Sequence, residues 1–136
     1  MIIQDIYINQ YDWKSTIYYN VNKSDCNIII EHLFDICDDN DIFETIDFLR
    51  NITDNNGITY SNILKKKSII VISNTSSALE FQDTYDHEKC HLAAHISTRY
   101  SIDPFSEEFA YLVGEIGRQM YPVSKLFMCD HCRGTM

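Results

Sequence analysis

Apolar residues in the first part of the chain are spaced for two strands and then for a helix. Alternation of apolar and polar residues predicts a strand on each side of a polar turn at residues 9–14. From Cys26 to Cys37 the apolar residues recur every three or four positions, which predicts an amphipathic helix with Ser24 as its N-cap. The chain is therefore expected to begin with a strand pair that is followed by a helix.

A second helix is expected after a polar break at residues 38–40. Asp41 and Glu44 have the spacing of a capping box, in which two side chains bind each other's backbone amide groups. The apolar positions that follow predict a helix to about Asn51. The run Asn55-Asn56-Gly57 then marks a turn before the second half of the chain.

Two further strands are expected at residues 58–63 and 67–73. The second has the sequence KSIIVIS, whose continuous apolar run is typical of a central strand covered on both faces. A chain of 136 residues is expected to fold as one domain.

Two longer helices are expected after these strands. Ser77 is followed three residues later by a glutamate, again the capping-box spacing, and predicts a helix that runs to about Tyr100. The pair Asp103-Pro104 suits the N-cap and first position of a last helix at about 104–120, and Pro122 marks its end. The order of the elements predicts an α+β domain with a small mixed sheet backed by helices.

Composition and charge indicate which kind of protein this is and which kinds of partner it can bind. Hydrophobic residues make up 45% of the chain and charged residues 23%, which is typical of a folded globular domain. The 20 acidic and 11 basic residues give a formal net charge of −9, which argues against a nucleic-acid partner. The apolar runs are far shorter than the roughly 18 residues that a membrane span needs, and no secretory signal is visible.

The segment HEKCH at residues 87–91 contains a complete H-E-x-x-H motif within the helix expected after Ser77. Residues four apart lie one turn above each other on a helix, so His87 and His91 can direct two imidazoles at one Zn²⁺ ion. Glu88 then lies beside the open metal position, where it can accept a proton from bound water. The alternative is a helix that carries two incidental surface histidines.

A catalytic zinc needs a third protein ligand, and His95, Glu107 and Glu108 are the candidates. His95 lies about 12 Å from His87 along a straight helix, so we expect it outside the coordination sphere or exposed. Glu108 is expected to face solvent or to hold a histidine. Glu107 is favoured, although a carboxylate that stabilises the helix N-terminus is its alternative role. Its helix face holds residues that are mostly small and allow a close approach of two helices: Ala110, Tyr111, Gly114 and Gly117.

The HEKCH motif followed by SEEFAYLVG at 106–114 resembles the small gluzincin-type zinc metallopeptidase domains, in particular short ones encoded by bacteriophages and prophages. The resemblance covers about residues 67–121 and includes the E-x-x-A-Y spacing. It implies zinc on the two motif histidines and Glu107, with Glu88 as the general base. It also implies a zincin-like fold, with strand 67–73 in the sheet and an adjacent edge strand that binds substrate in extended form.

The predicted function is zinc-dependent hydrolysis of a peptide bond. Glu88 takes a proton from zinc-bound water, which attacks the polarised carbonyl group. Tyr111 can donate a hydrogen bond to the developing oxyanion or pack in the core, and Arg118 is the other nearby donor. The partner is then a peptide or protein substrate, in the cytoplasm of a bacterial host.

The second hypothesis is a non-catalytic, zincin-like structural or assembly protein of a bacteriophage virion, alone or as an oligomer. The intact Glu88 favours catalysis, because a structural zinc has no use for a general base. The short chain and the scarcity of oxyanion donors favour a protein that binds other virion proteins. In either case the zincin-like core comprises about residues 58–121, preceded by strands and helices over 1–52 and followed by a tail at 122–136.

One C-x-x-C pair, Cys129 and Cys132, lies in this tail. With His131 it forms half of a zinc site, which a second chain or Cys26 or Cys37 would have to complete. A flexible tail without a ligand is the alternative. The five cysteines are an odd number, and we expect them to be reduced thiols.

Overall fold

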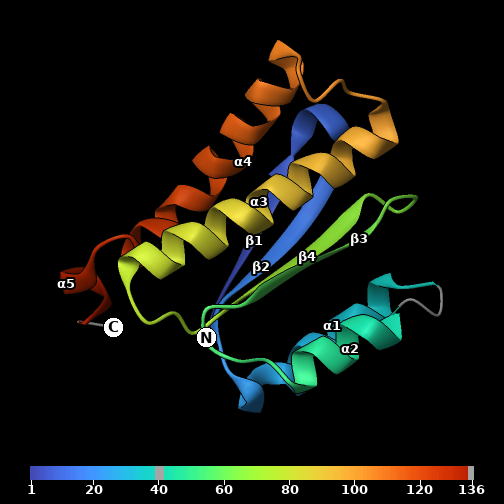
Figure 1. The fold of residues 1–136 in the computed structure, drawn as a ribbon. Helices are drawn as coiled ribbons and strands as arrows, with labels where there is room; N and C mark the ends of the chain where they lie inside the picture. Colours follow the sequence, from blue (N-terminus) through green and yellow to red (C-terminus); the bar gives the residue numbers. More distant parts are fainter. Residues whose placement is uncertain (39–41, 135–136) are drawn as a thin grey trace.

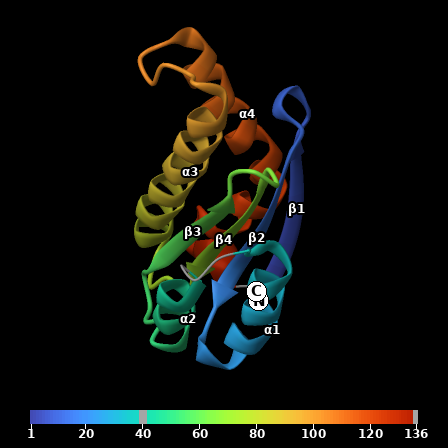
Figure 2. The same ribbon diagram turned by 90° about the vertical axis from the view of Figure 1, so that its right-hand side faces the viewer.

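A computed structural model describes residues 1–38 and 42–134 and places its four strands in one mixed sheet (Figure 1). In order across the sheet, the strands are β1 (Ile2–Ile8), β2 (Trp13–Val21), β4 (Lys67–Ser73) and β3 (Gly57–Asn62). Neighbours are antiparallel except for β2 and β4, which run parallel. β1 and β3 are therefore the edge strands (Figure 2). The turn after β1 is shorter than the predicted 9–14, because β2 already begins at Trp13.

Two pairs of helices cover the two faces of the sheet, so the fold has three layers (Figures 1 and 2). One face carries α1 (Cys26–Ile36) and α2 (Ile42–Arg50), and the other carries α3 (Ala78–Tyr100) and α4 (Glu107–Ser124). This architecture confirms the α+β class and the small mixed sheet. None of the described helices has the length and apolar character needed to cross a membrane.

Strand β4 supplies side chains to the apolar cores on both faces of the sheet. Ile70 and Ile72 belong to the cluster beneath α3 and α4, whereas Ile69 and Val71 belong to the cluster beneath α1 and α2. All four are at most 1% exposed. Burial of each such side chain stabilises the fold by about 1.5–3 kcal/mol, so β4 holds both helical layers onto one sheet. The predicted central strand is confirmed.

Helix α3 begins where the capping-box pattern predicts. Ser77 Oγ accepts a hydrogen bond from the Glu80 N–H at 3.1 Å. The helix ends at Ser101, whose left-handed backbone conformation (φ 54°) prevents a further turn. Its inner face packs on the sheet through large apolar side chains: Phe81, Tyr85, Leu92 and Ile96.

Helix α4 starts later than the predicted residue 104. Its N-cap is Ser106, whose Oγ accepts the Phe109 N–H at 3.2 Å. Asp103 does not cap the helix, because its Oδ1 accepts the Phe105 N–H at 3.0 Å and stabilises a separate turn. The proline that follows Asp103 therefore lies in this turn and not in the helix.

The end of α4 also differs from the prediction that Pro122 marks it. The helix continues to Ser124, with Pro122 inside it. Proline lacks the N–H that would bind the Arg118 carbonyl oxygen, but both residues are exposed, so water can take its place. Met120 and Ser124 are completely buried, and their burial favours continuation of the helix.

The residue that caps the start of the helical segment leading into α1 is Asn22, and not the predicted Ser24. Asn22 and Asp25 form a capping box around a 3₁₀ turn at Lys23–Asp25. Ser24 donates its hydroxyl hydrogen to the Asn22 side chain at 2.5 Å and caps no helix. The predicted cap of α2, Asp41, lies outside the described residues.

We predict that Ser77→Ala lowers the free energy of unfolding by about 1 kcal/mol, because the first turn of α3 loses its side-chain cap. Ser24→Ala should change this free energy by less than about 0.5 kcal/mol. Urea denaturation followed by circular dichroism measures both variants. Equal losses would contradict this assignment of the caps.

Candidate functional site

The two motif histidines lie one turn apart on the exposed side of α3. The Nε2 atoms of His87 and His91 are 3.1 Å apart, and their ring centroids are 4.7 Å apart. Two Zn–N bonds of about 2.0–2.1 Å at a tetrahedral angle separate the nitrogen atoms by about 3.3 Å. The pair therefore has close to the spacing that a shared zinc ion requires.

Glu88 points away from the solvent, into the contact between α3 and β3. It is only 4% exposed, and its Oε1 accepts a hydrogen bond from Thr59 Oγ1 at 3.0 Å. Burial raises the pKa of the Glu88 carboxyl, while the Thr59 hydrogen bond and the neighbouring His87 and His91 act in the opposite direction. A buried carboxyl with a raised pKa thus lies beside two exposed imidazoles.

Gly57 allows strand β3 to approach Glu88. A Cβ atom on this residue would lie 2.8 Å from Glu88 Cγ and 3.0 Å from both Glu88 Oε2 and Thr84 Cγ2. These distances are too short for non-bonded atoms, so only glycine fits without a shift of its neighbours. Since β3 is an edge strand, the contact sets Glu88 beside the edge of the sheet. The sequence marks Gly57 only as part of a turn.

A polar hollow of about 160 Å³ adjoins Glu88. It is lined by residues of α3 and of the chain that enters β3: Asn55, Asn56, Asp83, Thr84, His87 and Glu88. Asp83 lies one helical turn before His87, on the same side of α3. The hollow can accommodate a few water molecules next to the buried carboxyl.

His95 is bound to strand β3 and is half-buried. Its Nδ1 lies 2.6 Å from Ser61 Oγ, which in turn lies 2.6 Å from Ser68 Oγ. The buried Trp13 completes this chain, because its Nε1 donates to Ser68 Oγ at 2.8 Å. Burial and the nearby His91 lower the pKa of His95. Of the two roles expected for His95, the exposed one is wrong.

Glu107 does not lie beside the histidine pair. Helix α4 contacts α3 at Gly117, where a Cβ atom would lie 3.6 Å from both Lys89 Nζ and Tyr85 OH, the residues that flank His87. Glu107 precedes Gly117 by ten residues, about 15 Å along the helix axis. The expected return of the chain therefore brings Gly117, and not Glu107, next to the turn of α3 that carries the motif.

The other candidates on α4 have partners elsewhere or are exposed. The Glu108 carboxylate accepts a hydrogen bond from the Tyr11 hydroxyl at 2.9 Å and so holds the turn after β1, not a histidine. Tyr111 is 73% exposed, so the prediction that it packs in the core is wrong. Arg118 pairs with Glu115 on its own helix, with a shortest distance of 2.7 Å.

An apolar groove of about 470 Å³ separates the upper ends of α3 and α4, which diverge toward their connection (Figure 1). Its lining comes from α3, from the connection and from the start of α4: Cys90, Ala94, Ser97, Thr98, Ile102, Pro104 and Phe109. Gly114 has no atom within 4 Å of an added Cβ, so the small residues on α4 do not all face α3. The helices approach each other around Gly117.

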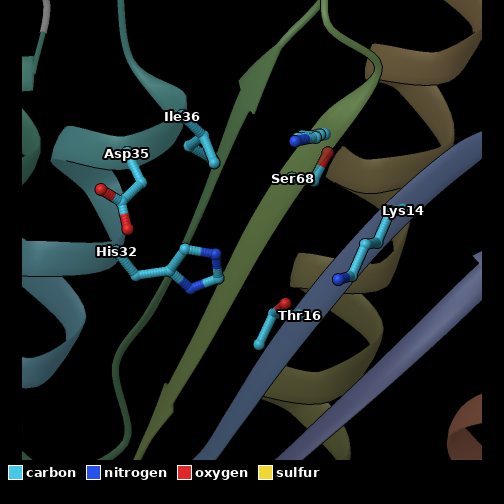
Figure 3. A pocket seen from close by; sticks show the side chains of 7 residues that line it. Lys14, Thr16, His32, Asp35, Ile36 and Ser68 are labelled. Atoms are coloured by element: carbon cyan, nitrogen blue, oxygen red, sulfur yellow. The ribbon is translucent and has the colours of Figure 1, made fainter.

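A second polar hollow, of about 150 Å³, lies on the opposite face of the sheet, between α1 and strands β2 and β4 (Figure 3). It is lined by charged, polar and apolar side chains: Lys14, Thr16, His32, Asp35, Ile36, Lys67 and Ser68. Burial lowers the pKa of His32, whose Nδ1 lies 2.7 Å from the Tyr18 hydroxyl. The lining therefore carries both positive charges, on the two lysines, and a negative charge, on Asp35. None of the residues of the H-E-x-x-H motif lines this hollow.

Within residues 1–38 and 42–134, no group of three or more His, Cys, Asp or Glu side chains is arranged to hold a metal ion. The predicted ligands that lie together are His87 and His91. No protein-family model, no curated protein and no solved structure matches this chain. The zincin-like fold and the peptidase activity are therefore proposals, supported by the residues of the site alone.

We predict that Gly57→Ala lowers the free energy of unfolding by about 1–3 kcal/mol, because the new methyl group overlaps Glu88 and Thr84. Gly114→Ala is the matched control. Its methyl group meets open space within a helix, so it should raise this free energy by about 0.5–1 kcal/mol. Chemical denaturation measures both, and a neutral Gly57→Ala would contradict the close approach of β3.

Burial of Glu88 also predicts a dependence of stability on pH in the metal-free protein. Because its pKa is raised in the folded state, the wild type loses stability relative to Glu88→Gln as pH rises from the unfolded-state pKa of about 4.3 through the folded-state value. The variant should therefore melt at a higher temperature at pH 7, and the two should melt together below about pH 4.

Glu31→Gln, which replaces an exposed carboxylate on α1, is the control for this experiment. It should alter stability by less than about 0.5 kcal/mol across the same pH range. Thermal melts of the three proteins between pH 3 and pH 8, run in a chelator, provide the comparison. A Glu88→Gln protein that is less stable than the wild type at pH 7 would contradict a net cost of burying this carboxylate.

Proposed function

We propose that this protein is a zinc-dependent hydrolase of peptide bonds, with His87 and His91 as metal ligands. The observation that carries the proposal is the 3.1 Å separation of their exposed Nε2 atoms next to the buried Glu88. Two imidazoles on one helical turn are a donor set that suits zinc. When bound, zinc acts as a Lewis acid and lowers the pKa of water.

Glu88 is the residue that accepts a proton in this proposal. Burial raises its pKa toward the pH at which an enzyme works, which makes a carboxylate a better general base. The Thr59 hydroxyl donates a hydrogen bond of 3.0 Å to one carboxyl oxygen of Glu88 and so fixes the orientation of the Glu88 side chain. The adjoining hollow, which includes His87 and Glu88 in its lining, gives water access to this carboxyl.

Strand β3 is the proposed binding edge for the substrate. An edge strand presents backbone N–H and C=O groups that can pair with an extended peptide. Because Gly57 and Thr59 of this strand contact Glu88, a peptide paired with β3 would pass close to the motif. This placement favours peptides over small compact substrates.

The position of Glu107 favours a second candidate function, a non-catalytic zincin-like structural or assembly protein. A catalytic zinc takes three protein ligands, and Glu107 lies about 15 Å along α4 from the residue that contacts the motif turn. Tyr111, at 73% exposed, is not held in place by packing as an oxyanion donor would be. The two functions make different predictions for metal content and for hydrolysis.

We predict that the purified protein binds about one zinc ion per chain and that His87→Ala and His91→Ala each weaken binding by more than about tenfold. Glu107→Ala is the matched control and should retain the metal, because the residue lies apart from the pair. Elemental analysis and zinc titration measure these outcomes. A wild type that binds no zinc, or a His87→Ala variant that binds it fully, would contradict the proposed site.

We also predict that Glu88→Gln keeps its zinc and hydrolyses casein about 10²- to 10⁴-fold more slowly than the wild type, because it has lost the proton acceptor. Release of acid-soluble peptides measures this rate. Equal rates would overturn the role of Glu88. A zinc-loaded wild type without hydrolysis would instead support the second candidate function.

A further inference from the structure

The tail beyond α4 is docked against the start of α3. It forms a 3₁₀ turn at Lys125–Phe127 and the short helix α5 (Asp130–Arg133), which lies beside the first turn of α3 (Figure 1). Phe127 is 4% exposed and stacks on Phe81, with ring centroids 5.0 Å apart. The expectation of a flexible tail is therefore wrong for the part of it that the structure describes.

Two polar contacts hold α5 in place. Asp130 Oδ1 accepts a hydrogen bond from the Ala78 N–H, the first residue of α3, at 2.7 Å. The Arg133 guanidinium donates to Thr75 Oγ1 at 2.7 Å and also to the Thr75 carbonyl oxygen. Asp130 lies between the two cysteines of the C-x-x-C pair, and Arg133 follows them. The backbone around both thiols is thus anchored from two sides.

The two thiols are exposed and lie about one helical turn apart. Cys129 directly precedes α5 and Cys132 lies within it. The neighbouring Cys132 and His131 groups lower the pKa of Cys129. The Cys129 side chain in turn raises the pKa of Cys132. The two cysteines therefore differ, and Cys129 is the one expected to attack first as a nucleophile.

We infer that Cys129 and Cys132 form a thiol–disulfide exchange site that reacts with small-molecule disulfides. The inference rests on two exposed thiols that are three residues apart at the first turn of α5, on an anchored backbone. It does not depend on the zinc proposal, because Ala78, where α5 is docked, precedes His87 by nine residues, about 13 Å along α3.

The reaction balances with glutathione disulfide as the oxidant. The Cys129 thiolate attacks one sulfur of glutathione disulfide, the S–S bond breaks, and one glutathione leaves as a thiolate that takes up a proton. Cys132 then loses its proton, and its sulfur attacks the Cys129 sulfur of the mixed disulfide. The second glutathione leaves, so the protein dithiol is oxidised by two electrons to a disulfide and glutathione disulfide is reduced to two thiols.

The remaining cysteines provide an internal control. Cys26 is buried and Cys37 is half-buried, whereas Cys90 is exposed on α3. Cys90 therefore reports the reactivity of an accessible thiol without the contacts of the pair. If exposure alone governed the reaction, Cys90 and Cys129 would react at the same rate.

The test treats the full chain and the variants Cys132→Ser and Cys129→Ser with glutathione disulfide, followed by alkylation and peptide mass spectrometry. We expect the wild type to form a Cys129–Cys132 disulfide without a lasting glutathione adduct. Cys132→Ser should keep glutathione on Cys129, which should react about tenfold faster than Cys90 in the same chain. Cys129→Ser should react at Cys132 no faster than at Cys90.

Two results would overturn the inference. One is a wild type that accumulates glutathione on both cysteines without joining them. The other is a Cys132→Ser protein in which Cys129 reacts no faster than Cys90. Circular dichroism spectra of the reduced variants that match the wild type show that they are folded, and neither result bears on whether His87 and His91 bind zinc.

Discussion

The close contact between strand β3 and helix α3 determines the geometry of the candidate site. Gly57 has no Cβ atom, so the Glu88 side chain fits against the strand, and Thr59, two residues further on, binds its carboxyl group. The turn of α3 that carries the two histidines is thereby fixed relative to the edge of the sheet. A larger residue at Gly57 would have to displace either the strand or this turn.

This contact has a cost, because a carboxyl group is taken out of water. The Thr59 hydroxyl supplies one hydrogen bond, yet burial still raises the pKa of Glu88. The remainder of the contact between β3 and α3 is polar as well, with His95 bound to Ser61 further along the strand. Groups with a perturbed pKa cluster at functional sites, which agrees with the proposed role of Glu88.

Local features of the sequence were sufficient to predict α3, the central strand β4 and the histidine pair. Helical periodicity alone makes His87 and His91 neighbours, and the capping pattern at Ser77 gives the start of the helix that carries them. The contact of Glu88 with Gly57 could not be predicted, because it joins residues 31 positions apart through the packing of a strand on a helix.

The position of Glu107 could not be predicted for a similar reason. The small residues on α4 indicate which face can approach α3, but they do not determine which residues lie opposite each other. In the structure Gly117 meets the motif turn, while Gly114 faces open space. The start of α4 at Ser106 instead of Asp103 also depends on a turn hydrogen bond that competes with the cap.

The most direct test of a zinc centre at the β3–α3 contact is anomalous diffraction at the zinc absorption edge, from crystals grown with zinc. The proposal predicts a peak about 2.0–2.1 Å from the Nε2 atoms of both His87 and His91. Glu88 should remain against Gly57 in the same crystals. Zinc bound elsewhere, with the two histidines free of metal, would contradict the central claim.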